Sequence, residues 1–160
     1  MNNLSDDPRN GTACLSRAGL AIGDGAKTGP AIVAPNGAGI DYCIKGLAYH
    51  KADAATVLPL TAADAQAALT KCLYLIQINA AGTVSSVKGR EVLTADLTAG
   101  NDVLEWPMPS DDTQCPIGAV KIETAAATTF TAGTTALDAA GITETYYNIC
   151  LGVPIEGLTS

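Results

Sequence analysis

The chain has little of the side-chain chemistry that enzymes use. Of its 160 residues only 4% are aromatic, and a single one, His50, is histidine. A serine or cysteine nucleophile that needs an imidazole base would have to use this one ring. His50 follows a strand pattern beside Lys51, so we interpret it as a surface or strand-end residue. We predict no catalytic residue and no enzyme activity, and the sequence leaves open a carboxylate pair assembled from distant strands.

Basic residues are also few, and they are scattered. Nine lysine and arginine residues lie between Arg9 and Lys121, none follows Lys121, and the net charge is −7. Affinity for nucleic acid depends on clustered cations that neutralise phosphates, so we predict no nucleic-acid partner. The last 39 residues carry only acidic charges. We interpret them as a solvated surface or, alternatively, as an acidic face that docks on a basic partner.

Long apolar runs are missing too. No stretch reaches the 18 apolar residues of a membrane span, and residues 1–8 lack the basic start and apolar run of a signal peptide. We therefore expect no membrane partner and reduced cysteines that act as small buried groups, with a disulfide between two of them as the alternative. The cysteines are too far apart for the paired spacing of a zinc site, so we predict no metal. They are Cys14, Cys43, Cys72, Cys115 and Cys150.

A glycine-rich stretch at residues 23–28 contains Lys27 and invites comparison with phosphate-binding loops. A P-loop has glycine directly before its lysine and again six positions before it, where this chain has Ala26 and Ala21. A dinucleotide fingerprint fails because Thr28 stands where the third glycine belongs. We therefore predict no cofactor.

Small residues are what the chain does have: alanine, glycine and threonine supply 62 of the 160 positions. Residues 1–39 hold seven glycines and three prolines, with short extended pieces at 18–22 and 31–34. This composition predicts an extended, irregular N-terminal arm. Residues 40–160 predict a single β-rich domain.

Period-two alternation and turn signals at intervals of roughly ten residues predict the fold class of this domain. We expect an all-β, mainly antiparallel body, either a β-sandwich or barrel-like, with one short helix. The strongest strand is 72–78, which a turn at 79–82 joins to 83–87 in a hairpin. The other predicted strands are 40–44, which could continue to Tyr49 past a bulge at Gly46, then 103–106, 117–123, 128–132 and 146–151.

Two segments are helix candidates. The better one is 61–69, which is rich in alanine and has Thr61 as a possible cap with Asp64 three residues later. The other, 93–97, is long enough for one turn. A helix of two turns needs packing to persist.

Three stretches together resemble small structural proteins of tailed bacteriophages. They are residues 36–46, residues 71–84 with the turn at Gly82, and residues 115–124 followed by 130–138. The resemblance covers about residues 36–151 and rests on strand and turn patterns. It implies a virion protein present in many copies, first a capsid decoration (cement) protein and second a tail or fibre component.

The resemblance also implies partners: the major capsid protein and further copies of this chain, expected as a homotrimer, in a virion assembled in the host cytoplasm. We expect the arm to grip neighbours by adding strands to sheet edges. A carbohydrate-binding adhesive module, with a platform of Trp106, Tyr146 and Tyr147, is the alternative from another class. The candidate interface residues are Ile22, Ile32, Val33, Trp106 and Met108.

Overall fold

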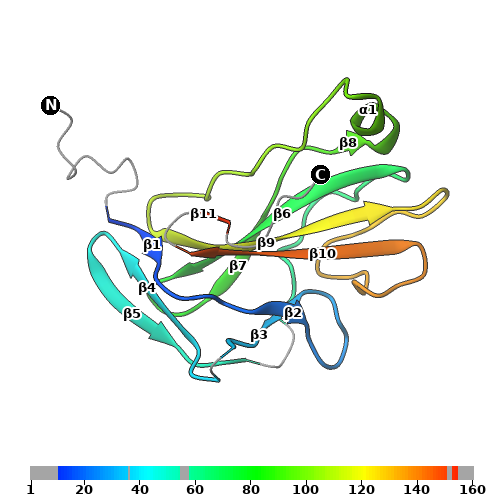
Figure 1. The fold of residues 1–160 in the computed structure, drawn as a ribbon. Helices are drawn as coiled ribbons and strands as arrows, with labels where there is room; N and C mark the ends of the chain where they lie inside the picture. Colours follow the sequence, from blue (N-terminus) through cyan, green and yellow to red (C-terminus); the bar gives the residue numbers. More distant parts are fainter. Residues whose placement is uncertain (1–10, 36, 55–57, 151–152, 155–160) are drawn as a thin grey trace, which may run out of the picture.

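The computed structural model of the chain describes residues 11–35, 37–54, 58–150 and 153–154. Antiparallel strands dominate these residues, in three sheets accompanied by one short helix (Figure 1). The predicted all-β class is therefore confirmed. The sheets do not close into a barrel, so the open, sandwich-like form of the prediction is the one that fits.

The sheets differ in size, and every strand pair in them is antiparallel. The large sheet has the order β11-β10-β9-β6-β7, with β8 beside the start of β6. Its strands are β6 (Thr70–Asn79), β7 (Val84–Lys88), β8 (Val92–Leu93), β9 (Gln114–Thr124), β10 (Ile142–Cys150) and β11 (Val153–Pro154). A second sheet, in the order β1-β4-β5, consists of β1 (Ala13–Cys14), β4 (Ile40–Ile44) and β5 (Leu47–Lys51). The third is the ribbon of β2 (Leu20–Ile22) and β3 (Pro30–Ile32).

The hairpin of β6 and β7 forms as predicted. The turn after β6 contains Gly82 with a positive φ of 76°, a conformation that glycine adopts without steric cost. The side chain of Asn79 stabilises the turn, because its Oδ1 accepts hydrogen bonds from the backbone N–H groups of Ala81 (3.0 Å) and Thr83 (2.9 Å). The long apolar β6 then lies inside the large sheet, between β7 and β9.

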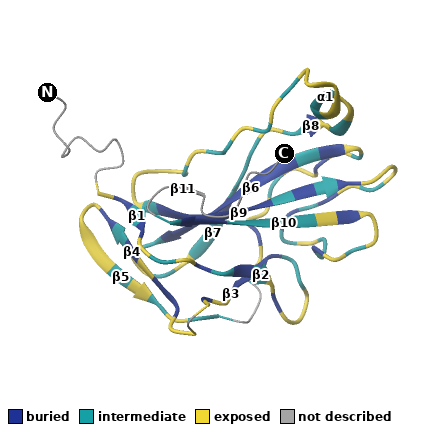
Figure 2. Ribbon diagram, in the orientation of Figure 1, coloured by how far each residue is buried: buried dark blue, intermediate teal, exposed yellow. Residues whose placement is uncertain are grey.

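One hydrophobic core lies between the large sheet and the smaller elements packed on it (Figure 2). The large sheet contributes Tyr74 and Ile122 to this core, and β4 contributes Ile40; all three side chains are fully buried. Phe130 also belongs to this core and packs edge-to-face on Tyr74, with ring centroids 5.7 Å apart. Aromatic pairs of this geometry add stability beyond the area that they bury.

The described part of the predicted arm packs onto this core. Cys14, Ala18, Leu20 and Ile32 are buried members of it. The backbone N–H of Leu20 donates a hydrogen bond of 2.9 Å to Oδ1 of Asn148 in β10. The segment therefore covers the large sheet instead of extending away from it, while residues 1–10 lie outside the described residues.

The better helix candidate, 61–69, is wrong. Its residues run without helix, and Gln66 instead makes a β-bridge with Phe130. The weaker candidate is the helix: α1 spans Thr94–Ala99 and ends at Gly100, whose φ is 71°. Alanine favours helix by only a fraction of 1 kcal/mol per residue, so the tertiary hydrogen bonds of Gln66 decide the conformation. Among the described residues, no helix is long and apolar enough to cross a membrane.

Two predicted strands are also wrong. Residues 103–106 belong to an extended segment, 101–110, that pairs with no strand and that we call the crossing segment. Pro107 and Pro109, which lack an N–H group, do not support a ladder there. Within 128–132 only Phe130 makes a β-bridge, because the chain turns just before it, at Ala127 with a φ of 60°.

Candidate functional site

β4 and β5 form a hairpin whose loop has two residues. Ile44 pairs with Leu47, and the intervening Lys45 and Gly46 both have positive φ, 51° and 79°. Positive φ at both central positions defines a type I′ turn, whose twist matches that of the strands. The predicted continuation past a bulge at Gly46 is therefore wrong, because the chain reverses direction there.

The two faces of this hairpin have different roles. On the inner face, Tyr42 is buried and stacks on Tyr49, with ring centroids 5.6 Å apart. The Tyr42 hydroxyl donates a hydrogen bond of 2.9 Å to the carbonyl of Asn79, at the end of β6. On the outer face, Asp41 and His50 lie opposite each other in the ladder, and Oδ1 of Asp41 is 2.8 Å from Nδ1 of His50. The inner face thus fixes the hairpin to the body, and the outer face is open to solvent.

β5 is the edge strand of its sheet and is largely exposed (Figure 2). In a two-residue hairpin, Leu47 and Tyr49 direct their N–H and C=O groups toward β4, so those of Ala48 and His50 point outward. Within the described ranges, β4 is the only strand that pairs with β5. The side chain of Leu47 is 63% exposed. An open strand edge with an apolar side chain is a place where a strand of another chain can add.

A shallow, open cleft of about 500 Å³ lies beside this edge. Its lining is mostly apolar, with the Asp41–His50 pair as the polar part. The residues that line it are Leu15, Asp41, Ala48, Tyr49 and His50. The cleft and the outer edge of β5 together form the candidate functional site, which we call the β5 surface.

The Asp41–His50 pair is not arranged as a catalytic triad. A triad needs a serine hydroxyl on the imidazole nitrogen that faces away from the carboxylate. The nearby hydroxyl, that of Ser16, instead accepts a hydrogen bond of 2.9 Å from the backbone N–H of Asp41. Ser16 therefore fixes the backbone of β4, and the pair joins the two strands of the hairpin.

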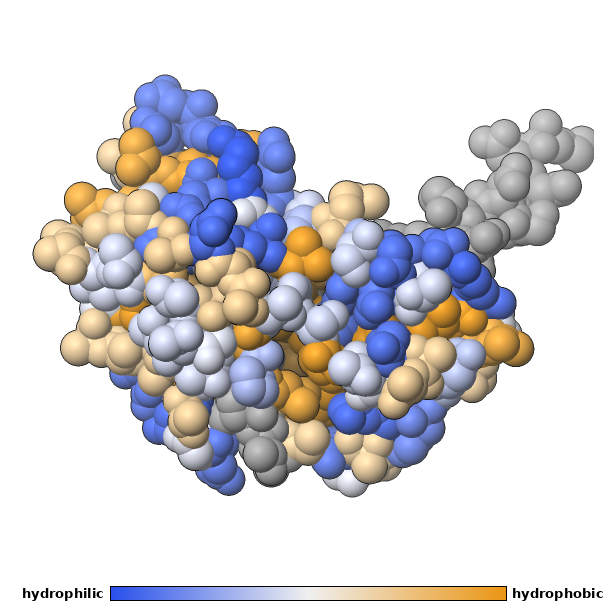
Figure 3. Space-filling model, turned by 180° about the vertical axis from the view of Figure 1, so that it is seen from behind, coloured by the Kyte–Doolittle hydropathy of each residue, from blue (hydrophilic) through white to orange (hydrophobic). Residues whose placement is uncertain are grey.

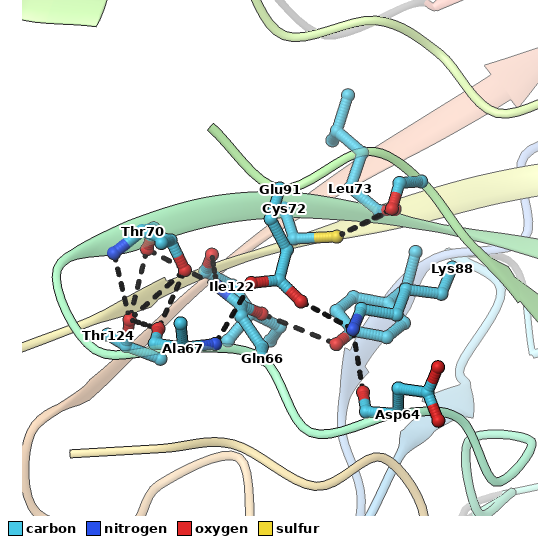
Figure 4. Close-up of polar contacts among 12 residues, drawn as sticks. Asp64, Gln66, Ala67, Thr70, Cys72, Leu73, Lys88, Glu91, Ile122 and Thr124 are labelled. Carbon is cyan, nitrogen blue, oxygen red and sulfur yellow. Dashed lines mark hydrogen bonds and ion pairs between the residues drawn. The ribbon is translucent and has the colours of Figure 1, made fainter. Parts of the chain in front are cut away.

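A group of polar contacts holds the 61–69 loop against the large sheet (Figure 4). Nζ of Lys88 donates hydrogen bonds to the carbonyl of Asp64 (2.6 Å) and to Glu91 (2.5 Å), and the other Glu91 oxygen accepts the N–H of Ala67 (2.9 Å). Burial opposes the ionisation of Glu91, but the hydrogen bonds from Lys88 and Ala67 outweigh it and lower the pKa of this carboxyl. The charged groups of Lys88 and Glu91 thus hold the loop by hydrogen bonds to its backbone at Asp64 and Ala67.

The thiols beside this group and in the core are poor nucleophiles. Burial raises the pKa of Cys72 to about 11, and it does the same for Cys14. A thiol reacts as its thiolate, so at neutral pH both groups react only slowly with reagents in solution. Within the described part of the chain, no three histidine, cysteine or acidic side chains lie close enough to hold a metal ion.

The crossing segment lies over the face of the large sheet that points away from the core. Gln77 and Ser110 anchor it reciprocally: Nε2 of Gln77 donates to Oγ of Ser110 (2.8 Å), and the Ser110 N–H donates to Oε1 of Gln77 (3.0 Å). Trp106 packs edge-to-face on Tyr147 of β10, with ring centroids 5.9 Å apart. Trp106 is half-buried, so its packing fits a cover over the sheet.

The five candidate interface residues do not form one surface. Ile32 has no exposed area and packs in the core, so it offers nothing to a partner. Ile22 in β2 is 37% exposed, and Val33, the residue after β3, is 47% exposed. Met108, on the crossing segment, is 79% exposed. The ribbon and the crossing segment contact opposite faces of the large sheet. On the side seen in Figure 3, hydrophobic residues likewise occur in separate groups among hydrophilic ones.

The proposed aromatic platform does not form either. Tyr146 and Tyr147 are consecutive residues of β10, so they point to opposite faces of the sheet. Tyr146 packs against the core, and in the part of the chain that the structure describes its buried hydroxyl has no hydrogen-bond partner. Trp106 packs on Tyr147, on the face of the sheet opposite to Tyr146.

The sequence interpretation missed the β5 surface. The sequence predicts one strand at 40–44 with a possible continuation to Tyr49 past a bulge, and this prediction includes no edge at residues 47–51. The signal was present: two residues ending in glycine, between two alternating runs, indicate a hairpin. Comparison with protein-family models, with curated proteins and with solved structures found no match for this chain.

Proposed function

We propose that this protein is a structural component of a tailed-bacteriophage virion, where it decorates the capsid and stabilises the head. The resemblance of residues 36–151 to small virion proteins implies this class, and the all-β fold is compatible with it. The partners in this proposal are the major capsid protein and further copies of the chain, as a homotrimer. The place of action is the virion, assembled in the host cytoplasm.

The observation that supports an assembly role most directly is the open edge of β5. Monomeric β-proteins usually cover such edges or protect them with charge, because an unpaired edge invites association. Here the edge presents the outward backbone groups of Ala48 and His50, next to the exposed Leu47. A decoration protein needs a surface of this kind, on which a strand of a shell subunit can pair.

A tail or fibre component is the second form of the proposal, and it would use the same surface against another partner. Copy number separates the two. The carbohydrate-binding alternative has less support, because glycan-stacking sites need exposed aromatic faces on one side of a sheet. Tyr146 and Tyr147 face opposite sides, and Trp106 packs on Tyr147.

Quantitative mass spectrometry of intact, gradient-purified virions tests the proposal. We expect the protein to sediment with the particles in hundreds of copies, at the stoichiometry of the shell. Tens of copies or fewer would place it in the tail or a fibre. Its absence from particles, together with specific binding on a glycan array, would overturn a virion role in favour of the adhesive module.

A pair of matched variants tests the β5 surface. Leu47 and Val103 are both 63% exposed, but Leu47 lies on β5 and Val103 on the crossing segment. We expect Leu47→Asp to weaken binding to undecorated shells by about tenfold or more, and Val103→Asp to leave it unchanged. Equal effects of the two substitutions, with both variants folded, would show that the β5 surface is not the contact.

A further inference from the structure

Two cysteines from distant parts of the sequence lie near each other where β1 contacts β10. Cys14 is the last residue of β1, and Cys150 is the last residue of β10. The two strands pack against each other. Sγ of Cys150 is 3.5 Å from the carbonyl oxygen of Leu15, the residue that follows Cys14.

Both side chains point toward the space between the two sheets. Cys14 lies opposite Tyr42 in the β1–β4 ladder and is a buried core residue, as Tyr42 is. Cys150 follows Asn148 by two positions in β10, so the two side chains point to the same face. That face is the inner one, because Oδ1 of Asn148 accepts the N–H of Leu20 there.

We propose that Cys14 and Cys150 are a disulfide-forming pair, which links the β1 sheet to the large sheet when the protein meets a disulfide oxidant. Burial is the main cause that raises the pKa of Cys14 to about 11, and the charge of Cys150 adds to it. This electrostatic effect of Cys150 on the pKa of Cys14 agrees with the short distance between the two residues. All five cysteines are thiols in the structure. The structure therefore represents the reduced protein, and the disulfide would form from it by oxidation.

The other cysteines are placed differently. Cys43 is adjacent to Tyr42 in β4 and therefore points to the opposite face of that sheet. The Cys72 thiol donates to the carbonyl of Gly89, 3.4 Å away, on the β7 side of the large sheet. Cys115 lies beside Ile78 in the β6–β9 ladder. The pairing of Cys14 with Cys150 rests on the contact of the Cys150 thiol with the carbonyl of Leu15, the residue that follows Cys14.

Oxidised glutathione is a suitable oxidant, and the exchange proceeds in two steps. Cys150 is half-buried and Cys14 is 1% exposed, so the Cys150 thiolate attacks first. The oxidant's sulfur–sulfur bond breaks, a mixed disulfide forms, and the first glutathione leaves and takes up the Cys150 proton. Cys14 then attacks the Cys150 sulfur and releases the second glutathione, which takes up the Cys14 proton. Two protein thiols are oxidised, and one glutathione disulfide is reduced to two thiols.

The test is incubation of the folded full chain with oxidised glutathione, then alkylation of the remaining thiols and peptide mapping. We expect one linked peptide pair that contains Cys14 and Cys150, and a fall in thiol count from five to three. Cys43→Ser is the matched control, since it removes a half-buried thiol elsewhere and should still form the link. Cys150→Ser should form no internal disulfide.

Three results would overturn the proposal. The first is glutathione retained on Cys150 without transfer to Cys14, which would show that the two sulfurs do not reach each other. The second is a linked pair that contains another cysteine. The third is complete alkylation of both residues while near-ultraviolet circular dichroism shows that the protein stayed folded.

Discussion

Gln66 is a single buried amide that decides the path of a whole loop. Its Nε2 donates hydrogen bonds to the carbonyls of Thr70 (3.2 Å) and Ile122 (3.1 Å), and its Oε1 accepts one from the Tyr74 hydroxyl (3.3 Å). Its backbone pairs with Phe130 in both directions. A fully satisfied buried amide specifies one conformation, because every alternative leaves polar groups without partners.

Replacement of this amide should be costly. Gln66→Leu keeps the approximate volume but removes the three side-chain hydrogen bonds of Gln66, to the carbonyls of Thr70 and Ile122 and from the Tyr74 hydroxyl. We therefore expect a loss of roughly 2–4 kcal/mol in the free energy of unfolding. Urea denaturation measures this. Gln114→Ala is the control, because Oε1 of Gln114 has no hydrogen-bond partner among the described residues, and it should cost clearly less. Equal losses for the two variants would contradict the role of Gln66.

Asp102 gives a prediction for the pH dependence of stability. The Arg90 guanidinium binds both of its oxygens, at 2.6 and 2.7 Å, and holds the pKa of Asp102 at about 2, below the ordinary 3.8. The folded state therefore binds this proton less readily than the unfolded state. The contribution of the pair is complete above the ordinary pKa and is lost as the pH falls through about 2.

The difference in unfolding free energy between the wild type and Asp102→Asn should thus be constant near neutral pH and shrink as the pH falls below the ordinary pKa of Asp102. Because the pair is partly exposed, it should also shrink at high salt. Urea unfolding at a series of pH values measures both effects. Arg90→Gln should reproduce the same profile, and a difference that grows toward acid pH would contradict the assignment.

At the scale of elements, two glycines are required for different reasons. Gly46 has a positive φ of 79° with nothing within 4 Å of an added Cβ, so Gly46→Ala should cost about 1 kcal/mol from backbone strain alone. A Cβ on Gly118 would lie 2.5 Å from the carbonyl oxygen of Tyr147 and 2.4 Å from Cδ1 of Leu20. Gly118→Ala should therefore cost more, roughly 2–3 kcal/mol. Denaturant unfolding of both variants checks the order, and the reverse order would contradict it.

The crossing segment can be followed through the only tryptophan in the chain. Gln77→Ala removes the hydrogen bonds to Ser110, so the segment should loosen and Trp106 should become more exposed. We expect a red shift of its fluorescence while the far-ultraviolet dichroism of the sheets is retained, with a stability loss of about 1–2 kcal/mol. Glu105→Gln, a change at an exposed neighbour, should leave the emission unchanged. An unaltered spectrum in Gln77→Ala would show that Ser110 does not hold the segment.

Strands with a strong local pattern could be predicted from the sequence. The alternation of 40–44 and the apolar run of 72–78 both identified strands, and the turn at Gly82 identified a hairpin. The 61–69 loop could not be found in this way, because its conformation depends on Phe130 and Ile122, which are more than fifty residues away. Local propensity is too weak to overcome such contacts.

At the scale of the whole molecule, the glycine content of the N-terminal segment was misleading. These glycines predict an irregular arm, but in the structure they let backbone segments pack closely. A Cβ on Gly19, for example, would lie 2.0 Å from the carbonyl oxygen of Val33. The β5 surface was equally hard to foresee, since whether a strand is an edge depends on the order of all strands in its sheet. The turn at Lys45 and Gly46 can be recognised from the sequence, but the order of the strands in the sheet cannot.

Deletion of residues 11–35 should therefore unfold the protein and not merely release it from a partner. The deletion removes Cys14, Leu20 and Ile32 from the core and exposes the inner face of the large sheet. We expect the shortened chain to lose cooperative thermal unfolding and to bind a hydrophobic dye. A shortened chain with native near-ultraviolet dichroism and a sharp melting transition would contradict this role.

The position of β6 in the large sheet has a consequence for biosynthesis. β6 is almost wholly buried, yet its long partner β9 ends at Thr124. On the ribosome, therefore, the most apolar strand of the chain emerges with only β7 and the two-residue β8 to pair with. The edge that pairs with β9 stays open until some forty further residues have been made. Slow or interrupted translation across residues 89–113 should make the nascent chain a substrate for chaperones and prone to aggregation.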